Sequence, residues 1–281
     1  GLYELGVEIE ENSELDLLVA FKEHENDPRI PEVCADMAKE MGEGKYYEDL
    51  NARMAQFELT LLDWAEAHKG ARKYVAFADK CWPAFPSQFG FEPCYVNSRL
   101  ASRGIPVSCE VDIYGALSEY IGLCISNDAV TLLDINNSVP KYIYDEDIKG
   151  KYDYKLTDTF MGFHCGNTPA CKMCESRAVK YQLIQHRLLE PAGSEPDFTR
   201  GTLEGDIAAS DITFYRLQCN SEGELVAYVA EGEVLDVPTR SFGGIGIFAI
   251  KEMGRFYRHV LIEGNYPHHG AVMFGHYGKQ F

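Results

Sequence analysis

Two short apolar runs in this sequence each end in a single acidic residue, and this pattern constrains the fold more than any other feature. Residues 105–109 are followed by Glu110, and residues 130–133 are followed by Asp134. In an open α/β sheet, ligand sites lie beyond the carboxyl ends of the strands. An isolated Asp inside a buried run would otherwise be a costly polar insertion. The two runs therefore predict strands that present Glu110 and Asp134 at a common site.

The spacing of apolar residues predicts an α/β fold with two parts. Helical spacing is present over residues 13–24, 31–41, 46–69, 114–124 and 175–189. Strands are predicted over 73–77, 105–109, 130–134, 159–164, 201–207, 211–219, 225–229 and 258–263, with a hairpin turn at 220–223. We therefore expect a Rossmann-like parallel α/β domain over residues 1–128. A mostly antiparallel, barrel-like β domain is expected over residues 129–281.

The bulk composition excludes several classes of protein. The 281 residues are 46% hydrophobic, which is enough for a sizeable core. There are 26 Lys and Arg against 44 Asp and Glu, so the net charge is −18 and no nucleic-acid partner is expected. No apolar run approaches the roughly 18 residues of a membrane span, so no membrane partner is expected. The nine cysteines, an odd number, predict reduced thiols and a cytoplasmic location.

The C-terminal segment, residues 267–278, supplies imidazoles next to glycines. His268 and His269 precede Gly270, and His276 follows Gly275. Neutral imidazole is a common metal ligand, and two carboxylates plus an imidazole suit a divalent cation such as Mn²⁺. The alternative interpretation is a turn with exposed histidines.

The acidic residues after the first run have a structural alternative as well. Glu110 and Asp112 are separated by one residue, so they point the same way if the strand continues. Both could instead stand at the start of the following helix, where negative charge is favourable, with Asp112 as its N-terminal cap.

A third group of candidate ligands contains cysteines. Cys171 and Cys174 have zinc-ligand spacing, and His164 or Cys165 could join them. A second pair with the same spacing is missing, so a pair of free thiols on a helix is the favoured interpretation. A zinc-stabilised domain remains the competing hypothesis.

These motifs together resemble the L-fucose isomerase family. The resemblance rests on residues 104–134, with Glu110 and Asp134 at this separation, and on the C-terminal His-Gly and Gly-His pairs. It extends over nearly the whole chain, and the L-arabinose isomerases are more distant. In that family a glutamate, an aspartate and a histidine hold Mn²⁺. The resemblance implies that Glu110, Asp134 and His269 hold Mn²⁺ or another divalent cation, with His268 as the alternative to His269.

The resemblance also implies an activity. It predicts a metal-dependent aldose–ketose isomerase that converts a deoxyhexose or pentose, such as L-fucose or arabinose, through an enediolate. A carboxylate near C2 can carry the carbon-bound proton, so Glu110 and Asp134 are the catalytic candidates. His276 and Asn167 are expected to contact sugar hydroxyls. Trp82 is expected to stack on the sugar or to pack in the core.

Family members carry an N-terminal domain before the α/β domain and assemble into oligomers. By resemblance, residues 1–128 correspond to the second domain of such an isomerase, shortened at its N-terminal end. A sugar is the expected small-molecule partner, and a homo-oligomer, either a trimer or a hexamer, is the expected assembly. The alternative function is a non-catalytic sugar-binding or assembly fragment of an isomerase scaffold.

Overall fold

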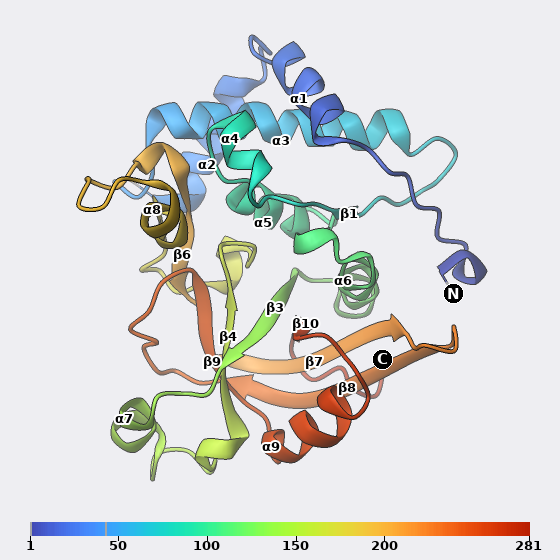
Figure 1. Ribbon diagram of the computed structural model, residues 1–281, viewed down its shortest axis with the longest axis vertical. Helices are drawn as coiled ribbons and strands as arrows, with labels where there is room; N and C mark the ends of the chain where they lie inside the picture. Colours follow the sequence, from blue (N-terminus) through green and yellow to red (C-terminus); the bar gives the residue numbers. More distant parts are fainter. Residues whose placement is uncertain (1, 43) are drawn as a thin grey trace.

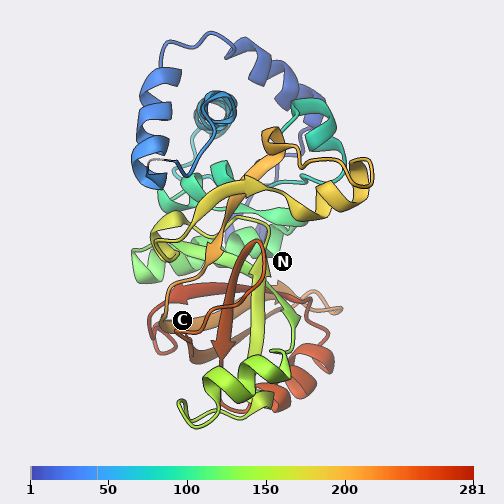
Figure 2. The same ribbon diagram turned by 90° about the vertical axis from the view of Figure 1, so that its left-hand side faces the viewer.

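The structure, a computed structural model, describes residues 2–42 and 44–281. Helices α1 to α5 gather at one end of the molecule, and the longer strands lie at the other end together with α7 and α9 (Figures 1 and 2). The helices are α1 (Glu14–Glu23), α2 (Ile30–Met41), α3 (Glu48–His68), α4 (Ala84–Phe89), α5 (Cys94–Ser102), α6 (Ile113–Ser126), α7 (Lys141–Ile143), α8 (Leu183–Leu189) and α9 (Met253–Phe256). The four helices predicted before residue 128 are confirmed as α1, α2, α3 and α6. Within the described residues, no helix is both long enough and apolar enough to cross a membrane.

Six strands of the described chain form a closed ring. They are β3 (Val130–Asn137), β4 (Thr159–His164), β7 (Ser210–Cys219), β8 (Leu225–Val234), β9 (Gly244–Ala249) and β10 (His269–Phe274). Their order is β4–β3–β10–β7–β8–β9, and β9 pairs back with β4. Every pairing around the ring is antiparallel, as the sequence predicted for this half.

Four further strands lie nearer the helical end. Strand β6 (Gly201–Asp206) pairs parallel with β9 and antiparallel with β5 (Ala178–Tyr181). Strands β1 (Phe77–Ala78) and β2 (Val107–Ser108) form a separate parallel pair. The expected mixed α/β fold is confirmed. The parallel pairing expected before residue 128 is limited to these two short strands.

Short turns complete the described structure. They are the 3₁₀ turns η1 (Leu2–Leu5), η2 (Cys109–Val111), η4 (Leu156–Asp158), η5 (Ala170–Lys172) and η6 (Phe198–Arg200) and the π-helical turns η3 (Tyr144–Ile148) and η7 (Tyr257–Ile262).

Two predicted elements are wrong. The strand expected over 258–263 is helical, because Phe256, Val260 and Leu261 recur at helical spacing and pack on the sheet core. The single helix expected over 175–189 is divided into β5 and α8. Residues 178–181 pair with β6 and bury Val179, so strand pairing overrides the local helical pattern there.

The hydrophobic core of the helical end extends into the later half of the chain. Its aromatic centre is made of Phe21, Phe57, Phe85, Phe89 and Phe91. The same cluster includes Val179 of β5 and Leu203 of β6. Separate clusters fill and cover the ring of strands. The division of the chain at residue 128 stays a prediction.

A buried guanidinium fastens α5 to the two long helices beside it. Arg99 is 1% exposed and bonds Glu58 of α3 at 2.5 Å. On α2 it bonds Asp36 at 2.8 Å and Glu40 at 2.9 Å. Glu58 is itself 3% exposed, and the guanidinium of Arg103 lies 3.5 Å from its other oxygen.

Replacing the buried partner should destabilise the helical end. We expect Arg99→Met to lower the free energy of unfolding by about 3–5 kcal/mol, because it leaves the Glu58 carboxylate buried with little compensation. Urea denaturation measures the change. Arg103→Gln is the matched control. Arg103 is exposed, bonds Asp36 at 2.8 Å and lies 3.5 Å from Glu58, so its loss should cost about 1 kcal/mol or less while Arg99 remains. Equal effects of the two variants would contradict the assignment.

Candidate active site

Three adjacent strands of the ring bring one carboxylate and two imidazoles together. Asp134 lies in β3, directly opposite His269 at the start of β10. On the other side of β3, His164 ends β4. Asp134 Oδ1 lies 3.1 Å from His269 Nε2 and 3.9 Å from His164 Nε2. Asp134 is therefore inside an antiparallel strand and not at the carboxyl end of a parallel one, which corrects the expected route to the site.

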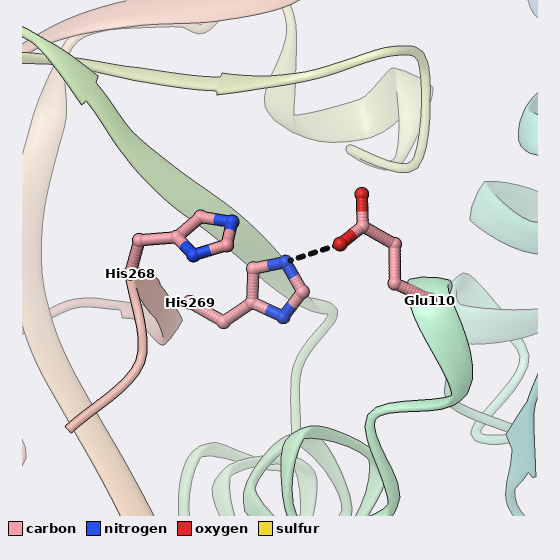
Figure 3. Close-up of side chains that lie close together, drawn as sticks. All are labelled: Glu110, His268 and His269. Atoms are coloured by element: carbon pink, nitrogen blue, oxygen red, sulfur yellow. Dashed lines mark ion pairs between the residues drawn. The ribbon is translucent and has the colours of Figure 1, made fainter.

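Glu110 reaches the same place from the helical end. It lies on turn η2, directly after β2, and Figure 3 shows its carboxylate facing His269. Its Oε2 is 3.5 Å from His269 Nε2. Glu110 and Val111 have φ values of 61° and 57°, and for a β-branched residue this conformation costs of order 1–3 kcal/mol. The bond from Val111 N–H to the Asp79 carbonyl, 2.8 Å, holds the strained turn.

Asp112 connects this turn to two strands. It caps α6 by accepting the Gly115 N–H at 2.8 Å, so the capping interpretation is confirmed for this residue. Its carboxylate also accepts from His269 Nδ1 at 2.8 Å. The guanidinium of Arg216, on β7, donates to both oxygens at 2.7 and 2.9 Å. The imidazole of His269 is thereby oriented with Nε2 toward Glu110 and Asp134.

Arg216 was missed by the sequence analysis. It is 4% exposed and stands among the buried residues Phe214 and Tyr215. A charged residue is rarely buried inside an apolar strand without a partner. An arginine in this apolar stretch of sequence could therefore have indicated a buried ion pair.

Charge at the site is set by competition between burial and pairing. Burial alone would lower the pKa of His269, but the Asp112 and Asp134 carboxylates outweigh it and raise the pKa to about 9. Burial would raise the pKa of Asp134, yet the nearby imidazoles of His269 and His164 lower it. The pKa of His164 is lowered, chiefly by burial. The carboxyl of Asp112 has its pKa held far below the usual value by His269 and Arg216, against the effect of burial.

Three buried polar atoms converge without hydrogen-bond partners among the described residues. They are Asp134 Oδ1, His164 Nε2 and His269 Nε2, and they lie within 4.8 Å of one another. Unpartnered buried polar atoms are costly, so their convergence points to a group that fills the space between them. The 3.1 Å separation of Asp134 and His269 matches adjacent ligands of a six-coordinate cation with bonds of about 2.1 Å.

Two sets of side chains have the spacing to hold such a cation. One is Glu110, His268 and His269, and the other is Asp134, His164 and His269. His269 belongs to both. His268 Nε2 also lies 3.6 Å from Asp134 Oδ1, but the His268 side chain is 58% exposed. The oxygen and nitrogen donors present therefore fit a divalent cation.

A third set with ligand spacing already contains a cation. The set is His24, Asp27 and Asp63. The guanidinium of Arg29 bonds both carboxylates, at 2.6 Å each. Among the described residues, none of the sets with ligand spacing contains a cysteine. The zinc hypothesis for Cys165, Cys171 and Cys174 gains no support.

The remaining predicted site residues are placed as follows. Asn167 is buried and donates to the carbonyl of Val107 in β2, the strand that leads to Glu110. Trp82, in the loop after β1, is 37% exposed, which leaves its ring at the surface. The structure does not bring His276 close to Asp134 and His269. It lies beyond the opposite end of β10 from His269, with Nε2 3.2 Å from the Gly232 carbonyl.

Comparison with known sequences gives a consistent result. The sequence family described as L-fucose isomerase, C-terminal domain, matches residues 162–281. The resemblance of the chain to L-fucose isomerases is thereby confirmed, and the matched part of this isomerase-like chain includes His164, Arg216 and His269.

Curated relatives extend the similarity into the helical end. A sulfoquinovose isomerase of Priestia aryabhattai is 26% identical over 268 residues, covering 93% of this chain and 52% of the relative. A sulfoquinovose isomerase of Alkalicoccus urumqiensis is 26% identical over 230 residues, covering 76% of this chain and 44% of the relative. The isomerase-like chain spans about half the length of these relatives.

The link between Asp112 and His269 should be visible in the pH dependence of stability. Because the pKa of His269 is raised from 6.5 to about 9, its stabilising contribution is complete below pH 6.5 and is lost as the pH rises through 9. Asp112→Asn removes part of that contribution. In metal-free protein, the loss of unfolding free energy caused by Asp112→Asn should therefore be larger at about pH 6 than at about pH 9.5, by about 1–2 kcal/mol.

Urea denaturation at the two pH values, with a chelator present, measures this difference. The exposed Asp153→Asn is the control, because the ion pair of Asp153 is with Lys251 and not with a histidine. A loss from Asp112→Asn that is the same at both pH values would contradict the coupling.

Proposed function

We propose that this chain carries the catalytic site of a metal-dependent aldose–ketose isomerase. The observation that supports this most is the position of His269 Nε2, which lies 3.5 Å from Glu110 Oε2 and 3.1 Å from Asp134 Oδ1. The buried atoms Asp134 Oδ1 and His269 Nε2 have no hydrogen-bond partner among the described residues. The curated relatives, which are named as isomerases of the sugar sulfoquinovose, support the same reaction class.

In this proposal, Glu110, Asp134 and His269 hold a divalent cation, for which Mn²⁺ is the candidate. When bound, the cation would polarise the oxygens on C1 and C2 of the sugar and stabilise the negative charge of an enediolate. Asp112 and Arg216 keep His269 in the orientation that presents Nε2. Such supporting hydrogen bonds commonly tune metal affinity by 10- to 100-fold.

The proton transfers fall to the two carboxylates. Glu110, with a side chain 60% exposed, is accessible to take the proton from C2 of an aldose and to return it to C1. The proton on O2 must move to O1 in the same reaction. Asp134 Oδ1 is buried and has no partner among the described residues, so it is placed to accept the hydroxyl proton and pass it on. The net change is the conversion of a C1 aldehyde into a C2 ketone.

The side of the site formed by Glu110 and His268 is exposed, which has consequences for substrate binding and for assembly. Glu110 and His268 are both more than half exposed, so a further surface is needed to enclose a sugar there. A neighbouring copy of the chain in a trimer or hexamer is our candidate for that surface. Candidate substrates are a deoxyhexose or pentose, such as L-fucose or arabinose. Sulfoquinovose is a further candidate, because the curated relatives are named as isomerases of that sugar.

The test combines metal content with turnover. Purified protein should bind about one Mn²⁺ per chain and form ketose from at least one of these sugars. Glu110→Gln should lower the turnover by about 10²–10⁴-fold, because it removes the base, and should leave the urea unfolding curve unchanged. Glu222→Gln, in the exposed hairpin turn, is the matched control and should behave as wild type.

Retained turnover in Glu110→Gln would refute its role as the base. Absence of bound Mn²⁺ and of turnover in the wild type would instead favour the non-catalytic sugar-binding or assembly fragment.

A further inference from the structure

His164 is a buried imidazole of the site that the mechanism above does not use. It is 4% exposed and ends β4, beside the strand that carries Asp134. Its ring lies 6.0 Å from that of His269, centre to centre. Its position among the candidate ligands leaves open whether it binds a cation or another group.

The backbone decides which ring nitrogen of His164 carries the proton. The N–H of Cys165 points at His164 Nδ1 over 3.2 Å. A backbone N–H can only donate, so Nδ1 presents its lone pair and the proton of the neutral ring lies on Nε2. A protonated ring nitrogen cannot bind a cation.

His269 is held in the opposite state. Its Nδ1 donates to the Asp112 carboxylate at 2.8 Å, so Nε2 is the nitrogen that carries the lone pair once the ring has lost its second proton, as it must to bind a cation. The two buried histidines thus face the same space with different chemistry. His269 offers an acceptor suited to a metal, and His164 offers a donor.

The donor of His164 has no partner among the described residues. Its Nε2 lies 3.9 Å from Asp134 Oδ1, which is too far for a direct hydrogen bond. A hydroxyl group both donates and accepts, so one hydroxyl placed between them could donate to Asp134 and accept from His164.

We propose that His164 is a substrate-binding residue that donates its Nε2–H to a hydroxyl oxygen of a sugar or polyol, and that it is not a metal ligand. This inference rests on the proposed isomerase function for the identity of the ligand. The assignment of the proton to Nε2 is independent of that function.

The test separates metal binding from polyol binding. Mn²⁺ titration should give His164→Leu an affinity within twofold of the wild type, whereas His269→Gln should bind at least tenfold more weakly. With Mn²⁺ present, the affinity for non-reacting alditols (L-fucitol and L-arabinitol are the probes) should fall about tenfold in His164→Leu, as expected for one lost buried hydrogen bond. His164→Gln keeps a side-chain N–H donor and should recover part of this loss.

Loss of Mn²⁺ affinity in both His164 variants, comparable with that in His269→Gln, would make His164 a ligand and overturn the proposal. Unchanged alditol binding in His164→Leu would also overturn it. His259→Gln is the control for surface effects, because the His259 side chain is exposed and pairs with Glu263.

A spectroscopic measurement keeps the inference separate from the proposed function. Long-range proton–nitrogen NMR correlations of the metal-free protein should show His164 protonated at Nε2 and not at Nδ1. If the wild type binds neither Mn²⁺ nor an alditol, the isomerase proposal and the sugar-binding role fail together, even with that tautomer present. If it binds both but His164 is protonated at Nδ1, only the inference about His164 fails.

Discussion

The arrangement of the site depends on the carboxylate of Asp112. Its two oxygens accept from the N-terminus of α6, from Arg216 on β7 and from His269 on β10. These elements belong to the helical end and to the ring of strands, so one buried charge joins the two at the site. Charge-assisted bonds of this kind are short and strong, and the low local dielectric strengthens them further. Arg216 is buried, so it requires this partner as much as His269 does.

The site is built from local features that are unfavourable by themselves. Glu110 and Val111 occupy the left-handed region of backbone conformation. Asp134, His164 and His269 each present a buried polar atom that lacks a partner within the described residues. Such costs persist only where the surrounding structure fixes them, and they cluster at functional sites. Here the surrounding structure is the antiparallel pairing of β4, β3 and β10 together with the capped start of α6.

The hydrogen-bond partners of His269 and His164 decide what each imidazole can bind. One ring nitrogen is committed to Asp112 and the other faces Glu110 and Asp134. His164 is also a histidine and is equally buried, yet its Nδ1 accepts from the backbone N–H of Cys165. The difference in partner, and not in residue type, assigns one ring to a cation and the other to a hydroxyl in our proposals.

The sequence by itself determined the local elements and the residue types of the site. Helical spacing identified α1, α2, α3 and α6, and the apolar runs before Glu110 and Asp134 identified two strands. The resemblance to L-fucose isomerases singled out His269. These signals are local or lie in short motifs, so they can be identified from the sequence alone.

The tertiary structure alone decided the rest. Strand order and register placed Asp134 opposite His269, brought His164 and Arg216 to the same place, and carried His276 to the far end of β10. Packing against the sheet core also made residues 257–262 helical and not a strand. The physical reason is that register and strand order depend on side chains distant in sequence that must bury the same face together, which no local pattern encodes.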